Sequence, residues 1–216
     1  MRYKKILKLI ILCVLAAGLN YFLNTFSVYL IKIPLFLDTV FNAAVCFAAG
    51  LIPGLITALL SYTTMCIRNG NFDPFILCAV TEVILVWRFI PSLQSRSVNL
   101  KDTGNLPETA VTSFVSIFAR LMLLYIVCCI SISILGGFID FFYYSLMSNS
   151  KPYFSAEDTF KIGLLRSGIP VLTMNILSRI PVNLVDRFIV IFGGYFVSRL
   201  VRKFFADEKN YTIPNE

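Results

Sequence analysis

The stretch from Ile33 to Ile67 constrains this chain more than any other, because it is long and apolar and Asp38 is its only charge. A single helix of that length would run about 50 Å at about 1.5 Å per residue, whereas the hydrocarbon core of a bilayer is about 30 Å thick. The stretch therefore predicts two short membrane helices, broken at residues 50–54 (Gly-Leu-Ile-Pro-Gly). Pro53 suits the first turn of the second helix. Asp38 suits the first turn of the first, where the helix dipole favours a carboxylate.

Composition indicates an integral membrane protein. Of the 216 residues, 57% are hydrophobic and only 14% are charged, and the mean hydropathy is +0.79, whereas a soluble domain has about a quarter of its residues charged. We expect one membrane domain over residues 1–205, a polar cytoplasmic tail over 206–216, and a place in the cell membrane. The net charge of +7 does not indicate nucleic acid as a partner, since the basic residues cluster at helix ends, as membrane topology requires.

Missing residue types narrow the function. The chain has no histidine, which is the commonest general base and metal ligand. It also has no phosphate-binding loop of ATPases, no HExxH and no GxSxG. We therefore expect no enzyme, no cofactor and no metal site. All six cysteines lie in apolar runs without a CxxC pair, which is typical of buried small side chains.

The apolar runs predict an all-α fold, an integral membrane bundle of six transmembrane helices. Pro91 is expected to close the fourth helix, Gly136-Gly137 the fifth, and Pro181 to open the sixth after a half-helix over 169–180. The helices are expected over 6–31, the two halves of 33–67, 74–90, 109–135 and 181–204.

The mixed segment 138–167 is either an amphipathic excursion at the membrane surface or a set of interfacial aromatic residues. An even number of helices puts both termini on one side. Lysines and arginines gather on that side, and Asp73, Asp140, Glu157 and Asp158 lie on the other, which predicts that both termini are cytoplasmic.

Charges inside a bilayer cost several kcal/mol, so they need partners or a purpose. The segment 175–187 places Asn175, Arg179 and Asn183 four residues apart, on one face of a continuous helix, with Asp186 and Arg187 near its lower end. Pro181 can bend this line.

The functional interpretation is a polar cavity, open to the outside, between the fourth, fifth and sixth helices. The alternative is internal ion pairing of Asp186 with Arg179 or Arg120, and of Asp38 or Glu82 with another arginine. The candidate substrate-binding residues are Asp38, Asn42, Glu82, Arg120, Asn175, Arg179, Asn183 and Asp186.

Residues 34–60 and 180–201 resemble the substrate-capture (S) components of energy-coupling-factor transporters. The likeness is carried by Leu37-Asp38-Thr39, by the glycine-rich break at 50–54, and by the Pro-x-Asn-x-x-Asp-Arg pattern from Pro181 to Arg187. The resemblance implies a six-helix bundle that binds a vitamin or similar micronutrient on the outer side. It also implies a separate transmembrane T component and two cytoplasmic ATPases as partners, and toppling in the membrane as the way to release substrate.

In that family small residues of the first helix contact the T component. Here the matching patch is Ala16, Ala17 and Gly18 rather than Ala-x-x-x-Ala, and ordinary packing within the chain would explain it equally well. Members that carry metal ions depend on an N-terminal histidine, which this chain lacks. The charges and amides of 175–187 suit a zwitterionic or anionic heterocycle. The second hypothesis is a membrane sensor or scaffold module that signals to a partner protein.

Overall fold

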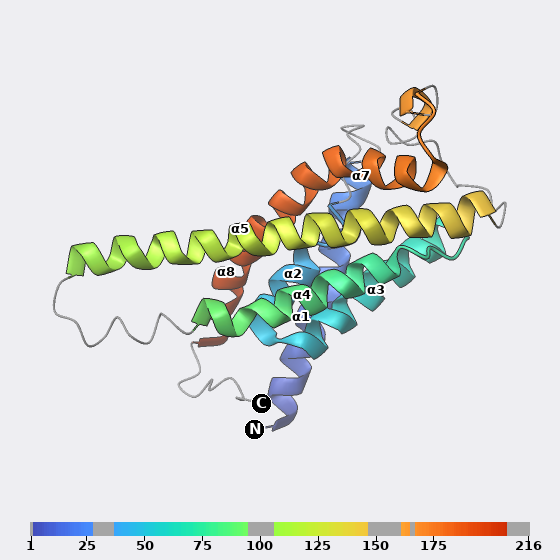
Figure 1. Ribbon diagram of the computed structural model, residues 1–216. Helices are drawn as coiled ribbons and strands as arrows, with labels where there is room; N and C mark the ends of the chain where they lie inside the picture. Colours follow the sequence, from blue (N-terminus) through green and yellow to red (C-terminus); the bar gives the residue numbers. More distant parts are fainter. Residues whose placement is uncertain (1, 28–36, 95–105, 147–160, 165–166, 207–216) are drawn as a thin grey trace.

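The computed structural model describes residues 2–27, 37–94, 106–146, 161–164 and 167–206. Within these ranges all regular structure is helical, which confirms the all-α fold class (Figure 1). The helices are α1 (Arg2–Thr25), α2 (Val40–Ala49), α3 (Leu51–Asn69), α4 (Ile76–Gln94), α5 (Leu106–Ile139), η3 (Asp140–Leu146), α7 (Val171–Phe188), η4 (Ile189–Gly193) and α8 (Gly194–Ala206), of which η3 and η4 are π-helical.

Among the described residues, five helices are long and apolar enough to cross a membrane, as a multi-pass membrane protein requires. The remaining expected span, the first half of 33–67, corresponds to α2 and is different. With ten residues, α2 covers about 15 Å, roughly half the thickness of a bilayer core. The five spans are Ile6–Thr25, Leu51–Asn69, Ile76–Leu93, Phe114–Tyr143 and Val171–Lys203.

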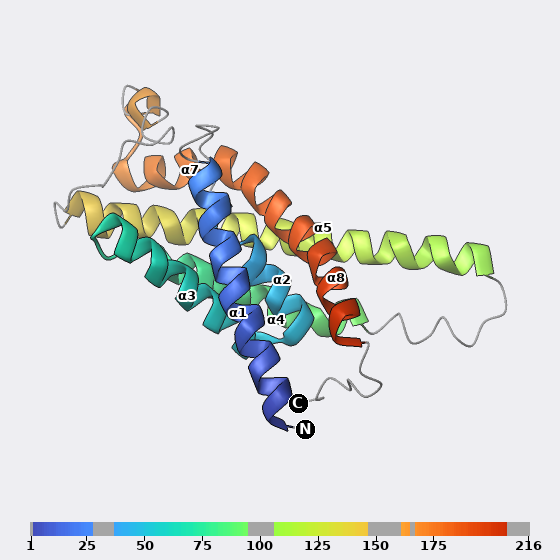
Figure 2. The same ribbon diagram turned by 180° about the vertical axis from the view of Figure 1, so that it is seen from behind.

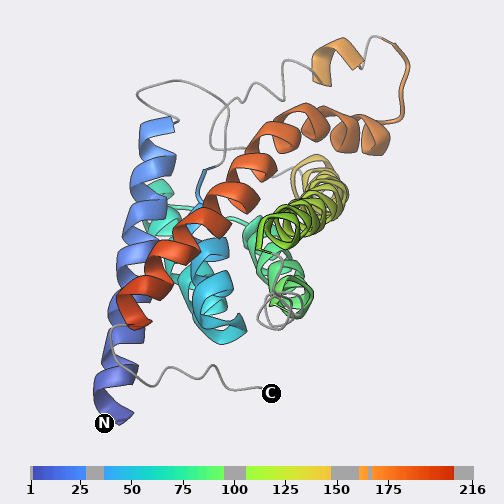
Figure 3. The same ribbon diagram turned by 90° about the vertical axis from the view of Figure 1, so that its left-hand side faces the viewer.

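Successive helices run back and forth, so the molecule has two ends. In Figures 1 and 2 the end of α3, the start of α4, the end of α5 and the start of α7 lie together, and we call this the α7 end. The end of α4, the start of α5 and the end of α8 lie at the opposite end. Figure 3 shows the first turn of α1 and the end of α8 on the same, lower side of the molecule.

Three expected helix boundaries are wrong. Pro181 lies inside α7, which begins ten residues earlier, directly after Pro170. Pro91 lies inside α4, and α5 continues through Gly136-Gly137. A proline removes one backbone hydrogen bond, but a helix packed in an apolar environment continues where its neighbours hold the flanking turns. The expected half-helix and the expected sixth helix therefore form one continuous helical segment, which runs from α7 through η4 to α8.

The predicted hairpin break is confirmed at Gly50, whose φ of 93° is in the region that favours glycine. Pro53 lies in the first turn of α3, as expected. Asp38, however, lies in the turn that precedes α2 rather than inside its first turn, because the helix begins only at Val40.

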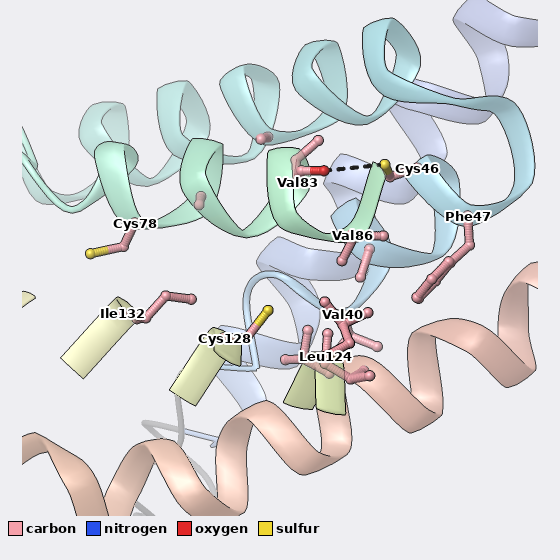
Figure 4. Close-up of a cluster of buried hydrophobic side chains, with 14 of the residues drawn as sticks. Val40, Cys46, Phe47, Cys78, Val83, Val86, Leu124, Cys128 and Ile132 are labelled. Carbon is pink, nitrogen blue, oxygen red and sulfur yellow. Dashed lines mark hydrogen bonds between the residues drawn. The ribbon is translucent and has the colours of Figure 1, made fainter. Parts of the chain in front are cut away.

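Helix α2 lies at the centre of the bundle. Eight of its ten residues are buried, and Val40 and Phe47 pack with side chains of α4 and α5 such as Val86 and Leu124 (Figure 4). The Cys46 thiol donates to the Val83 carbonyl oxygen at 3.4 Å. A helix surrounded by protein in this way need not be long enough to span lipid.

Helices α5 and α7 approach closely at two glycines. A Cβ atom on Gly137 would lie 2.5 Å from Cγ1 and 2.8 Å from Cα of Ile176, and one on Gly136 would lie 2.9 Å from an Arg179 guanidinium nitrogen. These residues therefore do not end α5 but let α7 lie against it, as small residues do between membrane helices.

We expect Gly137→Ala to destabilise the protein by about 1–3 kcal/mol, because the added methyl group overlaps the Ile176 backbone. Thermal unfolding of the purified protein in detergent measures the loss. Gly18→Ala in α1 is the matched control, since a Cβ there meets nothing within 4 Å. Equal stability of the two variants would contradict the close α5–α7 contact.

Candidate functional site

A face of α7 carries the polar residues that the spacing predicts. Asn175, Arg179, Asn183, Asp186 and Arg187 are all buried on one continuous helix, and the proline between them is exposed. The prediction of a polar ladder is therefore confirmed in its geometry. We call these five residues and the side chains that they contact the polar seam.

At the α7 end the seam is an ion-pair cluster. Nε and a terminal nitrogen of Arg179 donate to Oδ2 of Asp140 at 3.1 and 3.0 Å, and Lys161 Nζ donates to the same oxygen at 2.7 Å. The Arg179 guanidinium carbon also lies 4.4 Å from the ring centroid of Phe75, a cation–π contact. Gly136 leaves the space that the guanidinium fills.

Asp140 and Lys161 were missed by the sequence reasoning, which placed them in a loop on the membrane surface. The signal available was that Asp140 comes directly after a long apolar run, where a charge needs a partner. Which partner it has depends on the approach of α5 and α7 and cannot be read from spacing.

In the middle of the seam an amide joins α7 to α5. Asn183 Nδ2 donates to the Ser133 hydroxyl oxygen at 2.9 Å. Further towards the α7 end, Asn175 is 3% exposed and its Nδ2 has no hydrogen-bond partner. A buried amide donor in this situation is costly unless something else satisfies it.

At the lower end Arg187 joins α7 to α4 and to the turn before α2. Its guanidinium forms ion pairs with Glu82 and with Asp186, and it donates to the Thr39 hydroxyl at 3.3 Å. Thr39 in turn donates to Glu82 Oε2 at 3.2 Å, while Glu82 Oε1 has no hydrogen-bond partner. Glu82 is 0% exposed.

Asp38 lies beside this lower cluster. The charge of Arg187 acts on its carboxylate and the Tyr62 hydroxyl donates to it, but burial has the largest effect and raises the pKa of Asp38 from 3.8 to about 6. Burial also raises the pKa of Asp73, in the turn between α3 and α4.

Two candidate residues lie apart from the seam. Asn42 accepts from Asn20 Nδ2 at 2.8 Å and from the Ser61 hydroxyl at 3.4 Å, so it ties α2 to α1 and α3. Arg120 donates to the carbonyl oxygen of Ser92 near the end of α4, at the opposite end from Asp140.

The small-residue patch of α1 contains both buried and exposed residues. Ala16 and Ala17 are buried within this chain, and Ala16 packs with Cys13 and Val45. Packing within the chain is thus the interpretation that the structure favours for both alanines, which are not exposed for a partner. Only Gly18 faces outward.

The charges of the seam are in contact with one another. Of the two alternatives, the structure therefore favours internal ion pairing, though with other partners than expected. Asp186 pairs with Arg187 and not with Arg179 or Arg120, and Arg179 pairs with Asp140. In the part of the chain that the structure describes, no three acidic or cysteine side chains are arranged to hold a metal ion.

We expect Arg187→Met to destabilise the protein by about 3–5 kcal/mol, because Glu82 and Asp186 would lose their shared cation while staying buried. Thermal unfolding measures this loss. Arg199→Met is the control, since Arg199 is exposed on α8 and should change stability far less. The double variant Glu82→Gln/Arg187→Gln should recover part of the loss, and no recovery would contradict the ion pair.

Comparison with known proteins finds no family model, no curated protein and no solved structure that matches this chain. The function of the chain is therefore inferred from its own residues. The strongest observations are the apolar exterior of its long helices and the polar seam buried between α7, α5, α4 and the turn before α2.

Proposed function

We propose that this chain is the substrate-capture subunit of an ATP-driven importer of the energy-coupling-factor type. It would lie in the cell membrane with both termini in the cytoplasm and bind a small polar molecule from the outer side. The chain has no phosphate-binding loop of its own, so the energy would come from two ATPase subunits acting through a transmembrane T component.

One contact carries this proposal. Two of the three motifs that carry the family resemblance, Leu37-Asp38-Thr39 and Pro181 to Arg187, lie far apart in the sequence. Yet Thr39 and Arg187 are in hydrogen-bond contact and both contact Glu82. Short motifs that matched by chance would not be expected to meet around a buried charge. The contact is what a binding site built from both motifs requires.

The distribution of polarity supports the same function. Large hydrophobic side chains such as Phe22, Ile52, Phe114 and Leu123 are exposed, as lipid contact requires. Ionisable residues on the inside of such a bundle indicate a functional site by default. The seam begins at the α7 end, where Asp73 and Asp140, two of the residues predicted to lie on the outer side, are also located. Glu157 and Asp158 lie outside the described residues.

The chemistry of the seam suggests the kind of ligand. Two guanidinium groups, three carboxylates and two amides, from Glu82, Asp140 and α7, offer both charges and hydrogen bonds in an apolar setting. The Nδ2 donor of Asn175 and the Oε1 acceptor of Glu82 have no partner. A zwitterionic or anionic heterocycle with its own donors would satisfy these groups, whereas an apolar compound would leave them unpaired.

Purification of the tagged chain from native membranes tests the proposal at the level of partners. An importer subunit should bring down two ATPases and a second helical membrane protein. Recovery of a kinase or cyclase in their place would support the sensor or scaffold hypothesis and contradict transport.

A second experiment tests the site. Mass spectrometry of the gently extracted protein should detect a bound small molecule, and Arg179→Ala should lower its occupancy by at least about tenfold, since buried charged contacts are worth about 2–5 kcal/mol. Arg199→Ala, exposed on α8, should retain the molecule. The triple variant Asp140→Asn/Lys161→Gln/Arg179→Gln leaves no buried charge in that ion-pair cluster, so it should fold but not bind. Normal occupancy in folded Arg179 variants would overturn the assignment.

A further inference from the structure

Negative charge exceeds positive charge around Arg187. Its guanidinium contacts Glu82 and Asp186 directly, and its charge also acts on Asp38. Asp186 also has interactions beyond this cluster. Without Asp186, the charge of one guanidinium still acts on two carboxyl groups, Glu82 and Asp38. All of these side chains are buried, where an uncompensated charge costs several kcal/mol.

Of the three carboxyl groups, Asp38 interacts least directly with the Arg187 guanidinium. The two terminal guanidinium nitrogens of Arg187 are engaged by Glu82, Asp186 and Thr39. Its Nε has no hydrogen-bond partner among the described residues, and that includes Asp38. Among the described residues, no ion pair reaches Asp38, and its side-chain partner is the neutral hydroxyl of Tyr62. The excess charge therefore falls on this carboxyl group.

We propose that Asp38 is a buried proton-binding site, and that proton uptake neutralises the excess negative charge of the cluster formed by Asp38, Glu82, Asp186 and Arg187. A bound metal ion is the weaker alternative, since no three acidic or cysteine groups of the described chain converge on one point. A proton needs only one carboxyl oxygen. This inference does not depend on the proposed transport function.

The groups around Asp38 shift its pKa in both directions. Burial raises the pKa of Asp38 to about 6, although Arg187, the Tyr62 hydroxyl and the Asp38 backbone N–H each lower it. A shift of one pKa unit changes the proton affinity tenfold. The shift from the ordinary pKa of 3.8 to about 6 therefore raises the proton affinity of Asp38 on the order of a hundredfold. The titratable or charged groups that act on Asp38 are Arg187, Asp73 and Tyr62, and Cys78 acts on Tyr62. Glu82 and Asp186 are ion-paired with Arg187.

The direction of this shift sets the sign of the pH dependence. The folded protein holds the proton on Asp38 more tightly than the unfolded chain, so the stabilisation that Asp38 contributes is fully present below the unfolded pKa of 3.8. The advantage is lost as the pH rises through the folded pKa of about 6. Between these two values a proton on Asp38 would stabilise the junction of the α2 turn with α7.

Infrared spectroscopy of the purified full chain tests the proposal directly. The C=O stretch of a protonated carboxylic acid should be present at pH 5 and disappear with a midpoint near 6, and Asp38→Asn should remove this component. Asp73→Asn is the matched control, because an amide oxygen can keep the hydrogen bond from the Phe75 backbone N–H. It should leave the component in place with its midpoint at slightly lower pH, since the charge of Asp73 raises the pKa of Asp38.

A second variant is expected to shift the midpoint of the infrared component rather than remove the component. The Tyr62 hydroxyl stabilises the charged form of Asp38, so Tyr62→Phe should move the midpoint to higher pH. A midpoint near 4, or a component near 6 that survives in folded Asp38→Asn, would overturn the proposal. So would a rise in melting temperature with sodium or potassium ions at fixed pH and ionic strength that Asp38→Asn abolishes, since this would make the ligand a metal cation.

Discussion

Charges that are removed from water must be neutralised by contact, and the two arginines of α7 meet this condition in ways that fix the helix in place. Arg179 is held by Asp140 at the end of α5, and Arg187 by Glu82 of α4 and by Thr39 before α2. Desolvation offsets much of the attraction in such pairs, but removing one partner leaves a buried charge. The position of α7 is thus determined more sharply than apolar packing alone would determine it.

The apolar packing and the charged contacts depend on each other. Gly136 and Gly137 let α7 approach α5, and without that approach Arg179 could not reach Asp140. The short, buried helix α2 has a similar role, since it brings Thr39 inside the bundle to meet Arg187. A longer α2 that faced lipid would have carried this turn away from α4 and α7.

Features that depend on local periodicity and local backbone freedom could be predicted from the sequence. A spacing of four placed Asn175, Arg179 and Asn183 on one face, and the break at Gly50 results from the conformational freedom of glycine. The ends of α5 and α7 could not be obtained in this way, because a proline or glycine ends a helix only where no neighbour holds the next turn. The pairing partners were also inaccessible. Asn42 faces α1 and α3 because of the rotation of α2, which spacing along the chain does not determine.

A seam whose charges are already paired has a consequence for a capture subunit. Any ligand that enters must replace contacts such as Arg179–Asp140 with contacts at least as favourable, since a guanidinium left unpaired would oppose binding by several kcal/mol. A ligand without complementary charges would leave the separated ion-pair partners unpaired, and this cost would prevent it from binding. The seam would thus select ligands by the free energy of its unpaired polar groups. Opening would also part α7 from α5 at Gly137, where the two helices are in close contact. Binding and helix movement would then be one event, and the closed seam would be the resting state that a suitable ligand displaces.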